Sequence, residues 1–235
     1  ERVEADDDHR AFWAEEVADR IEARDPEDPI VIKGGVSPSG VPHIGHVNEI
    51  MRGYYVAEDL RERGHEVRQV FTSDDRDPLR SIPHRLMDLD WTLRERGEFD
   101  VGALGKNLGK PLTDVPDPFG CCDSFGAHQT ELLERSAELM GVPIEVVSNT
   151  QLYEGGEFEA VTRYLLERVE LARDVLAAYQ DKVDEEYVPF KPQCSECGLL
   201  TEGVRSVELD AGTVEYVCED VEAGNRTIEG CGHHG

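Results

Sequence analysis

The sequence has no long apolar run, little lysine beside its arginine, and no internal repeat. No stretch approaches the roughly 20 apolar residues of a membrane-spanning helix, so we expect neither a helical membrane protein nor a membrane partner. The chain does not open with the basic and then apolar pattern of a signal peptide, which predicts a cytoplasmic protein. Thiols stay reduced in that compartment, so the 6 cysteines are expected as free thiols or metal ligands.

The formal net charge is −27. Acidic residues are spread along the whole sequence, which indicates a solvated acidic surface on a folded protein rather than a disordered acidic tail. A halophilic source would account for this surface, because high salt screens the self-repulsion; an acidic protein from low salt is the alternative. Such a surface opposes nucleic-acid binding at low salt, so any RNA contact must use local arginine clusters.

Strand and helix patterns alternate along the chain. Apolar spacing predicts helices at residues 9–24, 44–64, 130–140 and 158–179 and strands at 30–32, 66–72 and 143–147. This alternation predicts an α/β fold with a doubly wound parallel sheet. The stretch 87–129 is interpreted as an irregular insertion. The prolines at 189–192 then divide a first part, 1–190, from a cysteine-rich segment, 191–235.

The segment 37–46 joins the first predicted strand to the next helix. Gly40 lets the backbone approach a ligand, and the helix start directs unpaired N–H groups at the turn, which suits a phosphate. His43 and His46 lie on about the same face of the first helical turn. They can donate hydrogen bonds to oxygens whose charge grows during a reaction. Gly45 between them leaves a surface without a side chain, against which a base could lie.

A charged loop at residues 73–78 follows the second predicted strand. In an open parallel sheet, ligands collect beyond the carboxyl ends of the strands, so this loop and the 37–46 segment should face one crevice. Asp74 and Asp75 are candidates for pairing with a buried cation, although loop aspartates also commonly cap helices.

Four residues of metal-ligand type lie close together: Asp117, Cys121, Cys122 and His128. Adjacent cysteines make a poor disulfide. Thiolates, a neutral imidazole and a carboxylate are ligands that zinc accepts tetrahedrally. A buried cysteine pair beside a helix cap is the alternative.

The C-terminal segment resembles a zinc ribbon. Its cysteines are Cys194, Cys197, Cys218 and Cys231. The first pair has the spacing of a zinc knuckle, and stretches 207–209 and 213–218 predict a hairpin between the two pairs. Four cysteines close a structural site and leave no open position for chemistry. The long gap before Cys231 is unusual, so His233 remains an alternative ligand.

Several motifs carry a family resemblance. The run His43-Ile44-Gly45-His46 resembles the HIGH signature of class I aminoacyl-tRNA synthetases. The loop from Ser73, the Pro-Asp-Pro-Phe-Gly-Cys run ending at Cys121, and the Leu-Tyr-x-Gly run at 152–155 resemble, in the same order, the archaeal class I lysyl-tRNA synthetases. This resemblance implies that 1–190 is the first part of a Rossmann-like catalytic domain. It also implies ATP-dependent formation of lysyl-adenylate and transfer of lysine to tRNA(Lys).

The resemblance also implies roles for single residues. His43 and His46 would be catalytic, with Mg²⁺ on the departing pyrophosphate. The residues at ATP would be Ser39, Gly40, His43, Gly45 and His46. The residues at lysine would be Gly35, Ser37, Asp74 and Asp75. The family's zinc ligands correspond to Asp117, Cys121, Cys122 and His128, which with the ribbon predicts two structural Zn²⁺ ions.

The family's second signature, Lys-Met-Ser-Lys-Ser, is absent, and nothing resembles an anticodon-binding domain. We therefore expect an N-terminal fragment with little activity by itself. Two alternatives remain open from the sequence. One is another class I synthetase, for arginine or glutamate, which shares the histidine signature. The other is a non-catalytic zinc-ribbon module that recruits RNA or protein.

Overall fold

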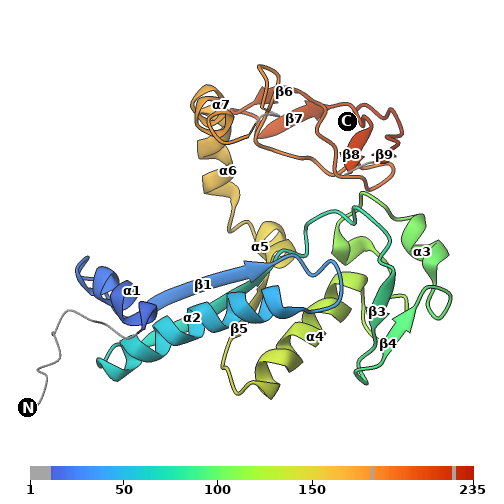
Figure 1. Ribbon diagram of the computed structural model, residues 1–235. Coiled ribbons are helices and arrows are strands. Elements are labelled where there is room, and N and C mark those ends of the chain that lie inside the picture. The colour runs from blue at the N-terminus through green and yellow to red at the C-terminus, as the bar shows by residue number, and fades with distance from the viewer. Residues whose placement is uncertain (1–11, 181–182, 224–225) are drawn as a thin grey trace, which may run out of the picture. The chain divides into compact units, whose positions relative to one another are not determined.

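Figure 1 shows the computed structural model, which describes residues 12–180, 183–223 and 226–235. The chain divides into two compact units. The first comprises the residues through Ser37, Pro42–Asp74 and Thr130–Ser148, and the second comprises Pro38–Val41, Asp75–Gln129 and Asn149–Gly235. The predicted boundary at residue 190 falls inside the second unit, so the domains 1–190 and 191–235 stay a prediction.

The first unit is built on a three-stranded parallel sheet. Its strands are β1 (Ile30–Val36), β2 (Val67–Ser73) and β5 (Glu145–Ser148), in the order β1-β2-β5. Val36 pairs with Ser73, which pairs in turn with Ser148, so the carboxyl ends of the strands meet at one edge. The parallel α/β arrangement is confirmed. Among the described strands the order follows the chain in one direction, so a second winding is not seen there.

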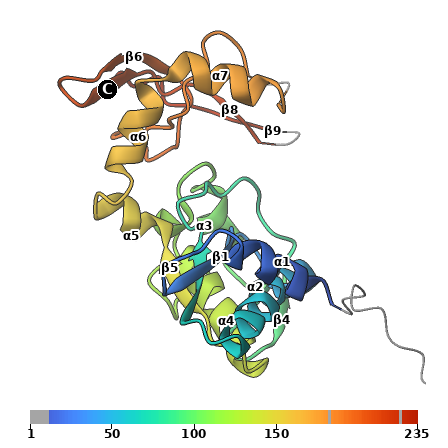
Figure 2. The ribbon, with the colours of Figure 1, turned by 90° about the vertical axis from the view of Figure 1, so that its left-hand side faces the viewer.

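Helices α1 (Trp13–Glu22), α2 (Ile44–Glu62) and α4 (Phe125–Leu139) supply the apolar faces that pack in this unit. α2 runs along β1 and β2 (Figures 1 and 2). Ile50, Phe71 and Leu133 are buried in one cluster. A second cluster contains Ala14, Ala18, Ile30, Val56 and Leu60. Within the described part of the chain, no helix combines the length and apolar character needed to cross a bilayer.

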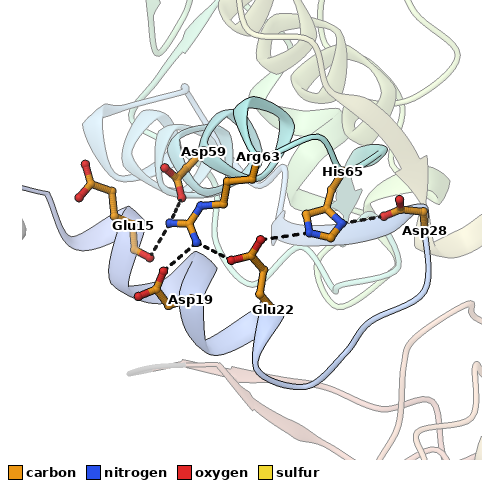
Figure 3. A network of polar contacts seen from close by, with 7 residues as sticks. All are labelled: Glu15, Asp19, Glu22, Asp28, Asp59, Arg63 and His65. Atoms are coloured by element: carbon orange, nitrogen blue, oxygen red, sulfur yellow. Dashed lines mark hydrogen bonds and ion pairs between the residues drawn. The ribbon is translucent and has the colours of Figure 1, made fainter.

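A cluster of ion pairs joins α1 to the end of α2 (Figure 3). The guanidinium of Arg63, directly after α2, lies 2.7 Å from the carboxylate of Asp19, 2.6 Å from that of Glu22 and 2.6 Å from that of Asp59. The hydrogen bond from Arg63 lowers the pKa of Glu22. One cation therefore connects two helices through three carboxylates.

His65 extends this cluster. Its Nε2 lies 3.2 Å from Glu22, and its Nδ1 lies 3.1 Å from Asp28 (Figure 3). The hydrogen bond to Asp28, helped by that to Glu22, raises the pKa of His65 above its ordinary value. A protonated imidazole can donate from both nitrogens, so both contacts favour the charged form.

Residues 75–129 of the second unit fold around an apolar core of their own. They contain the hairpin β3 (Arg85–Met87) and β4 (Leu93–Glu95), helix α3 (Val101–Gly105) and the 3-10 turn η1 (Leu112–Asp114). The buried core residues are Leu79, Leu86, Phe99, Leu104, Leu112, Val115 and Phe125. The expected irregular insertion at 87–129 is thus a packed element. Its apolar residues follow no single helical or strand period, which is why spacing alone does not reveal them.

The single helix predicted at 158–179 is wrong. The structure has α5 (Asn149–Glu154), α6 (Glu159–Leu166) and α7 (Val169–Ala177). At the break, the N–H of Arg168 donates to the carbonyl of Leu165, three residues back. The guanidinium of Arg168 donates to the carbonyl of Tyr164 at 3.3 Å and lies 4.0 Å from the Tyr164 ring. The side chain thus satisfies the carbonyl that a continuous helix would use.

The C-terminal segment forms two antiparallel hairpins. β6 (Val204–Glu208) pairs with β7 (Thr213–Tyr216), which confirms the predicted hairpin. β8 (Val221–Ala223) pairs with β9 (Arg226–Ile228) in the long gap before Cys231. The buried cluster of this segment consists of Cys194, Leu199, Tyr216 and Cys218. Half of its members are cysteines, so the apolar core is small.

Candidate functional site

The segment before α2 places His43 at the N-cap of that helix. His43 has extended backbone angles, and its carbonyl accepts from the N–H groups of His46 and Val47. Its Nδ1 accepts from the N–H of Gly45 at 3.0 Å, so the neutral ring carries its proton on Nε2. The exposed side chain therefore presents an N–H donor at the positive end of the helix dipole.

His46 stacks on His43. The ring centroids are 4.0 Å apart and the ring planes differ by 25°, so the two histidines share one face as predicted. Burial, and then the neighbouring His43, lower the pKa of His46 below its ordinary value. The ring of His46 is therefore neutral near neutral pH, and it can stabilise a growing negative charge by donating a hydrogen bond.

Gly45 is required beneath the His43 ring. A Cβ at this position would lie 2.8 Å from Cε1 of His43, a distance that real Cβ atoms do not reach. Glycine thus lets the ring fold over the first turn of α2. Gly45 is exposed, and its expected contact with a base stays a prediction.

Gly35 and Asp74 come together at the carboxyl edge of the sheet through Thr72. A Cβ on Gly35 would lie 2.3 Å from the Thr72 hydroxyl, so only glycine fits. The same hydroxyl donates to Oδ1 of Asp74 at 3.3 Å. The N–H of Asp74 donates to the carbonyl of Val36 at 2.9 Å, which joins the loop after β2 to the end of β1.

Asp75 has a different environment from Asp74. It is 5% exposed, and its Oδ1 accepts from the N–H of Thr150 at 2.8 Å, in the first turn of α5. This contact satisfies a helix donor that would otherwise have no partner in the helix. Asp75 thus supports the start of α5, whereas Asp74 is half-buried at the carboxyl edge of the sheet.

The remaining expected ligand contacts are not tested by the structure. Ser37 is half-buried at the end of β1. Ser39 is exposed, and Gly40 has open space where a Cβ would stand. Ser39 and Gly40 belong to the second unit, so their roles at ATP stay predictions.

The first expected metal site exists as a cluster. The ligand atoms of Asp117, Cys121, Cys122 and His128 all lie within 4.8 Å of one another. Nδ1 of His128 lies 3.3 Å from Sγ of Cys121 and 3.4 Å from Oδ1 of Asp117. The two Sγ atoms are 3.9 Å apart. A tetrahedral zinc ion with Zn–S bonds of about 2.3 Å places its sulfurs about 3.8 Å apart, so the spacing fits.

His128 is oriented by a contact on its other nitrogen. Nε2 donates to the carbonyl of Met87 at 2.8 Å. This bond holds the proton on Nε2 and leaves the lone pair of Nδ1 facing Cys121 and Asp117. Metal-bound histidines usually have such a partner, because it fixes the tautomer and the ring orientation.

The electrostatics of this cluster favour a cation. Burial, and then the neighbouring Asp117, raise the pKa of Cys121 to about 12. Burial opposes ionisation of Asp117 too, but N–H donors from Phe119 and Cys122 outweigh it and lower the pKa of the carboxyl. A buried carboxylate faces two thiols, and a bound cation would allow those thiols to ionise.

The four cysteines of the C-terminal segment form a second cluster, again with their sulfurs within 4.8 Å of one another. The Sγ atoms of Cys194 and Cys231 are 3.7 Å apart, and those of Cys197 and Cys218 are 3.6 Å apart. These distances exclude S–S bonds of about 2.05 Å and fit a tetrahedral ion. Nε2 of His233 lies 3.2 Å from the Ser195 hydroxyl, so the geometry favours Cys231 as the fourth ligand.

Residues 11–235 match the family model described as tRNA synthetases class I (K). The chain belongs to this family. It is similar to lysine–tRNA ligases of Haloarcula marismortui (74% identical), Natronomonas pharaonis (67%) and Halobacterium salinarum (66%), each over 96% of the chain. The chain spans only 42%, 42% and 41% of the length of these relatives. The three organisms are halophilic archaea, which supports the inference of a halophilic source from the acidic composition.

Three residues that position the candidate site residues are absent from the sequence-based predictions, and two of them, Thr72 and Met87, come first. Thr72 packs beneath Gly35 and donates to Asp74, and the Met87 carbonyl orients His128. Neither has a sequence signal, because a strand threonine and a main-chain carbonyl acquire these roles only through pairing of distant segments. Ser124 does have a sequence signal, because serine is a common N-cap residue. Its hydroxyl accepts from the N–H of Ala127, so α4 begins before His128 and includes it.

Proposed function

We propose that the full-length protein is a lysine–tRNA ligase, which activates L-lysine with ATP and transfers it to tRNA(Lys). The observation that carries this proposal is the 66–74% identity to three lysine–tRNA ligases over nearly the whole chain. The same relatives disfavour an arginyl- or glutamyl-tRNA synthetase. Because the chain spans about two fifths of those relatives, the complete reaction belongs to the full-length protein.

In the proposed first step, the lysine carboxylate attacks the α-phosphate of ATP in line, and negative charge is spread over the phosphoryl oxygens. Nε2–H of His43 and the neutral ring of His46 donate hydrogen bonds to these oxygens from the start of α2. The unpaired N–H groups of the same helix add to this field. Ser39, Gly40 and Gly45 would border ATP, and Mg²⁺ would supply positive charge for the departing pyrophosphate.

Lysine is proposed to lie at the carboxyl edge of the sheet. Gly35 and Ser37 hold its backbone end, and Asp74 accepts from its ammonium. The Thr72 hydroxyl donates to Asp74, which orients the carboxylate. We assign Asp75 to the support of this loop, since its carboxylate is already bonded to Thr150.

The two clusters are proposed to hold one structural Zn²⁺ each. Asp117, Cys121, Cys122 and His128 would hold one, and the four cysteines of the ribbon would hold the other, with ligand spacings that suit tetrahedral zinc. When bound, the ions would cross-link the segments that carry their ligands, and of these two regions the ribbon has the smaller apolar core. The ribbon should bind more tightly, because thiolates are soft ligands.

Three broader features follow from the same assignment. The remainder of the full-length protein would add strands to the parallel sheet and complete a doubly wound arrangement. It would also supply the missing lysine-rich signature and the contacts to the anticodon. A cytoplasmic location follows from the proposed role in translation.

Binding of a non-hydrolysable lysyl-adenylate analogue to the full-length protein tests this function. At 100 times its Kd the analogue should stabilise the protein by about 2.7 kcal/mol, seen as a higher unfolding temperature. The matching glutamyl and arginyl analogues should give much smaller shifts. No shift with any analogue would favour the alternative of a non-catalytic zinc-ribbon module.

A further inference from the structure

The basic residues of this acidic chain differ in whether a carboxylate lies close to their charged groups. In the first unit, Arg52, Arg61, Arg63 and Arg68 each have a carboxylate within 4.0 Å. In the second unit, the stretch 80–106 contains five exposed basic side chains, Arg80, His84, Arg85, Arg96 and Lys106. None of the five forms an ion pair with any residue that the structure describes. Unpaired cations are unexpected in a chain with net charge −27, where carboxylates are abundant.

Backbone and side-chain contacts bring together the segments that carry four of these residues. The guanidinium of Arg96 donates to the carbonyls of Ile82 and Pro83, and its N–H donates to the carbonyl of His84. Gly105, directly before Lys106, approaches the Ile82 side chain, since a Cβ there would lie 3.4 Å from it. Arg85 follows His84 at the start of β3. We call Arg80, His84, Arg85, Arg96 and Lys106 the basic cluster.

The acidic residues of the same stretch are mostly engaged elsewhere. Asp88 accepts from the N–H groups of Asp90 and Thr92 and pairs with Arg94. Glu98 accepts from the N–H of Glu95, and Asp100 caps α3. Glu95 lies opposite Arg85 in the hairpin, but their charged groups do not form an ion pair. No carboxylate in the described part of this stretch therefore forms an ion pair with the basic cluster.

Trp91 lies at the other end of the same hairpin. Its φ is +62°, a left-handed conformation that a bulky residue adopts only when the surrounding contacts impose it. Those contacts are present, because Asp88 accepts from two N–H groups of the loop and the N–H of Trp91 donates to the Asp88 carbonyl. The Trp91 side chain is nevertheless 42% exposed. The strained loop thus holds a large aromatic surface out toward solvent.

We propose that this hairpin is an RNA-binding surface, on which Trp91 stacks on an unpaired base of the tRNA and the basic cluster contacts its phosphates. The inference rests on the proposed function, which supplies the tRNA. Aromatic side chains beside cations bind single-stranded nucleic acid through stacking and charge. β3 has 3 residues, so at roughly 3.4 Å per residue Trp91 and Arg85 lie about 10–20 Å apart. The bond from His128 to the Met87 carbonyl fixes the hairpin at the end of β3.

The matched control for Trp91 is Trp13, the other tryptophan, which is also 42% exposed and packs beside Phe12 in the first unit. In the full-length protein, Trp91→Ala should weaken binding of fluorescently labelled tRNA(Lys) on the order of 10-fold or more, and Trp91→Phe should retain most of the affinity. Trp13→Ala should bind as the wild type does. Trp91→Gly should bind as weakly as Trp91→Ala while unfolding at no lower temperature than wild type, because glycine relieves the strained φ.

The salt dependence of tRNA binding tests whether the basic cluster contacts phosphates. Arg85→Gln and Lys106→Gln should each reduce the slope of log affinity against log salt by about 0.7–0.9, and Arg24→Gln, an exposed arginine of the first unit, should not. If the wild type binds tRNA and the hairpin variants match Trp13→Ala and Arg24→Gln, the surface is wrong and the proposed function stands. If the wild type binds no tRNA, the proposed function itself fails.

Discussion

The sheet unit and the zinc ribbon are stabilised in different ways. In the sheet unit, Ile50, Phe71 and Leu133 are buried in one of two apolar clusters. In the ribbon, Cys194 and Cys218 make up half of the buried cluster. A segment with so little apolar core would depend on the proposed zinc ion to fold. On this account the cysteines of the ribbon are needed for folding, whereas the apolar clusters of the sheet unit leave its polar residues free for the proposed chemistry.

The largest effect should follow from Cys194→Ser. Apparent binding free energies of structural zinc are about 10–16 kcal/mol, so loss of this ion should unfold residues 194–233 and leave the sheet intact. Elemental analysis should fall from two zinc equivalents to one, and amide hydrogen exchange should become fast only in the ribbon. If the amides of the ribbon stayed protected from exchange in this variant, its apolar core would be sufficient for folding. The ribbon and the sheet unit would then not differ in how they are stabilised.

A smaller effect should follow from His128→Ala. This variant should also lose one zinc equivalent, but the core around Leu79, Leu86 and Phe125 should keep its amides protected. We expect weaker lysine binding rather than unfolding, measured by calorimetry. His84→Ala, at an exposed histidine outside both clusters, is the control and should keep both ions. One zinc equivalent in the wild type, lost with Cys194→Ser and unaffected by His128→Ala, would remove the first site.

Asp74 and Asp75 allow the same distinction, between a residue used for binding and one used for folding, to be tested within one loop. Asp74→Asn should raise the lysine KM about 10- to 100-fold, since hydrogen bonds to charged groups are worth about 1.5–3 kcal/mol, and should leave the ATP KM nearly unchanged. Asp75→Ala should mainly lower stability, by about 1 kcal/mol, because it removes the carboxylate that caps α5. If both variants kept the wild-type lysine KM, the partner of the ammonium would have to lie elsewhere.

The smallest effect should be on the pH dependence of stability, through the ion pairs that His65 adds to those of Arg63. The folded-state pKa of His65 is raised, so its contribution to stability is complete below the ordinary value of 6.5 and is lost as pH rises through the folded pKa. The urea midpoint of the wild type should therefore fall more from pH 6 to pH 8.5 (roughly spanning that titration) than that of His65→Gln. The difference should shrink at high salt, which screens exposed charges. Equal pH dependence of the two proteins would contradict the assigned role of His65.

The sequence predicts the parallel sheet, the shared face of His43 and His46 and both groups of metal-ligand residues, because each rests on local spacing. It does not predict the break at Arg168, since no glycine or proline marks it and the cause is a side-chain contact with Tyr164. It also does not separate Asp74 from Asp75, because the cap on α5 depends on a residue 75 positions away in the chain. Long-range contacts of this kind carry no local pattern.

The central claim is that the histidine pair at the start of α2 stabilises the developing charge of lysine activation. Lysine-dependent pyrophosphate exchange by the full-length protein, with tRNA present, tests it most directly. His43→Ala and His46→Ala should each lower the rate about 100- to 1,000-fold without unfolding the protein. His43→Ala should also lower the unfolding temperature slightly, because it removes the side chain that caps α2. Ile44→Ala, at a residue between them that is 81% exposed, is the control and should behave as the wild type. Rates within about twofold of wild type for both histidine variants would contradict the claim.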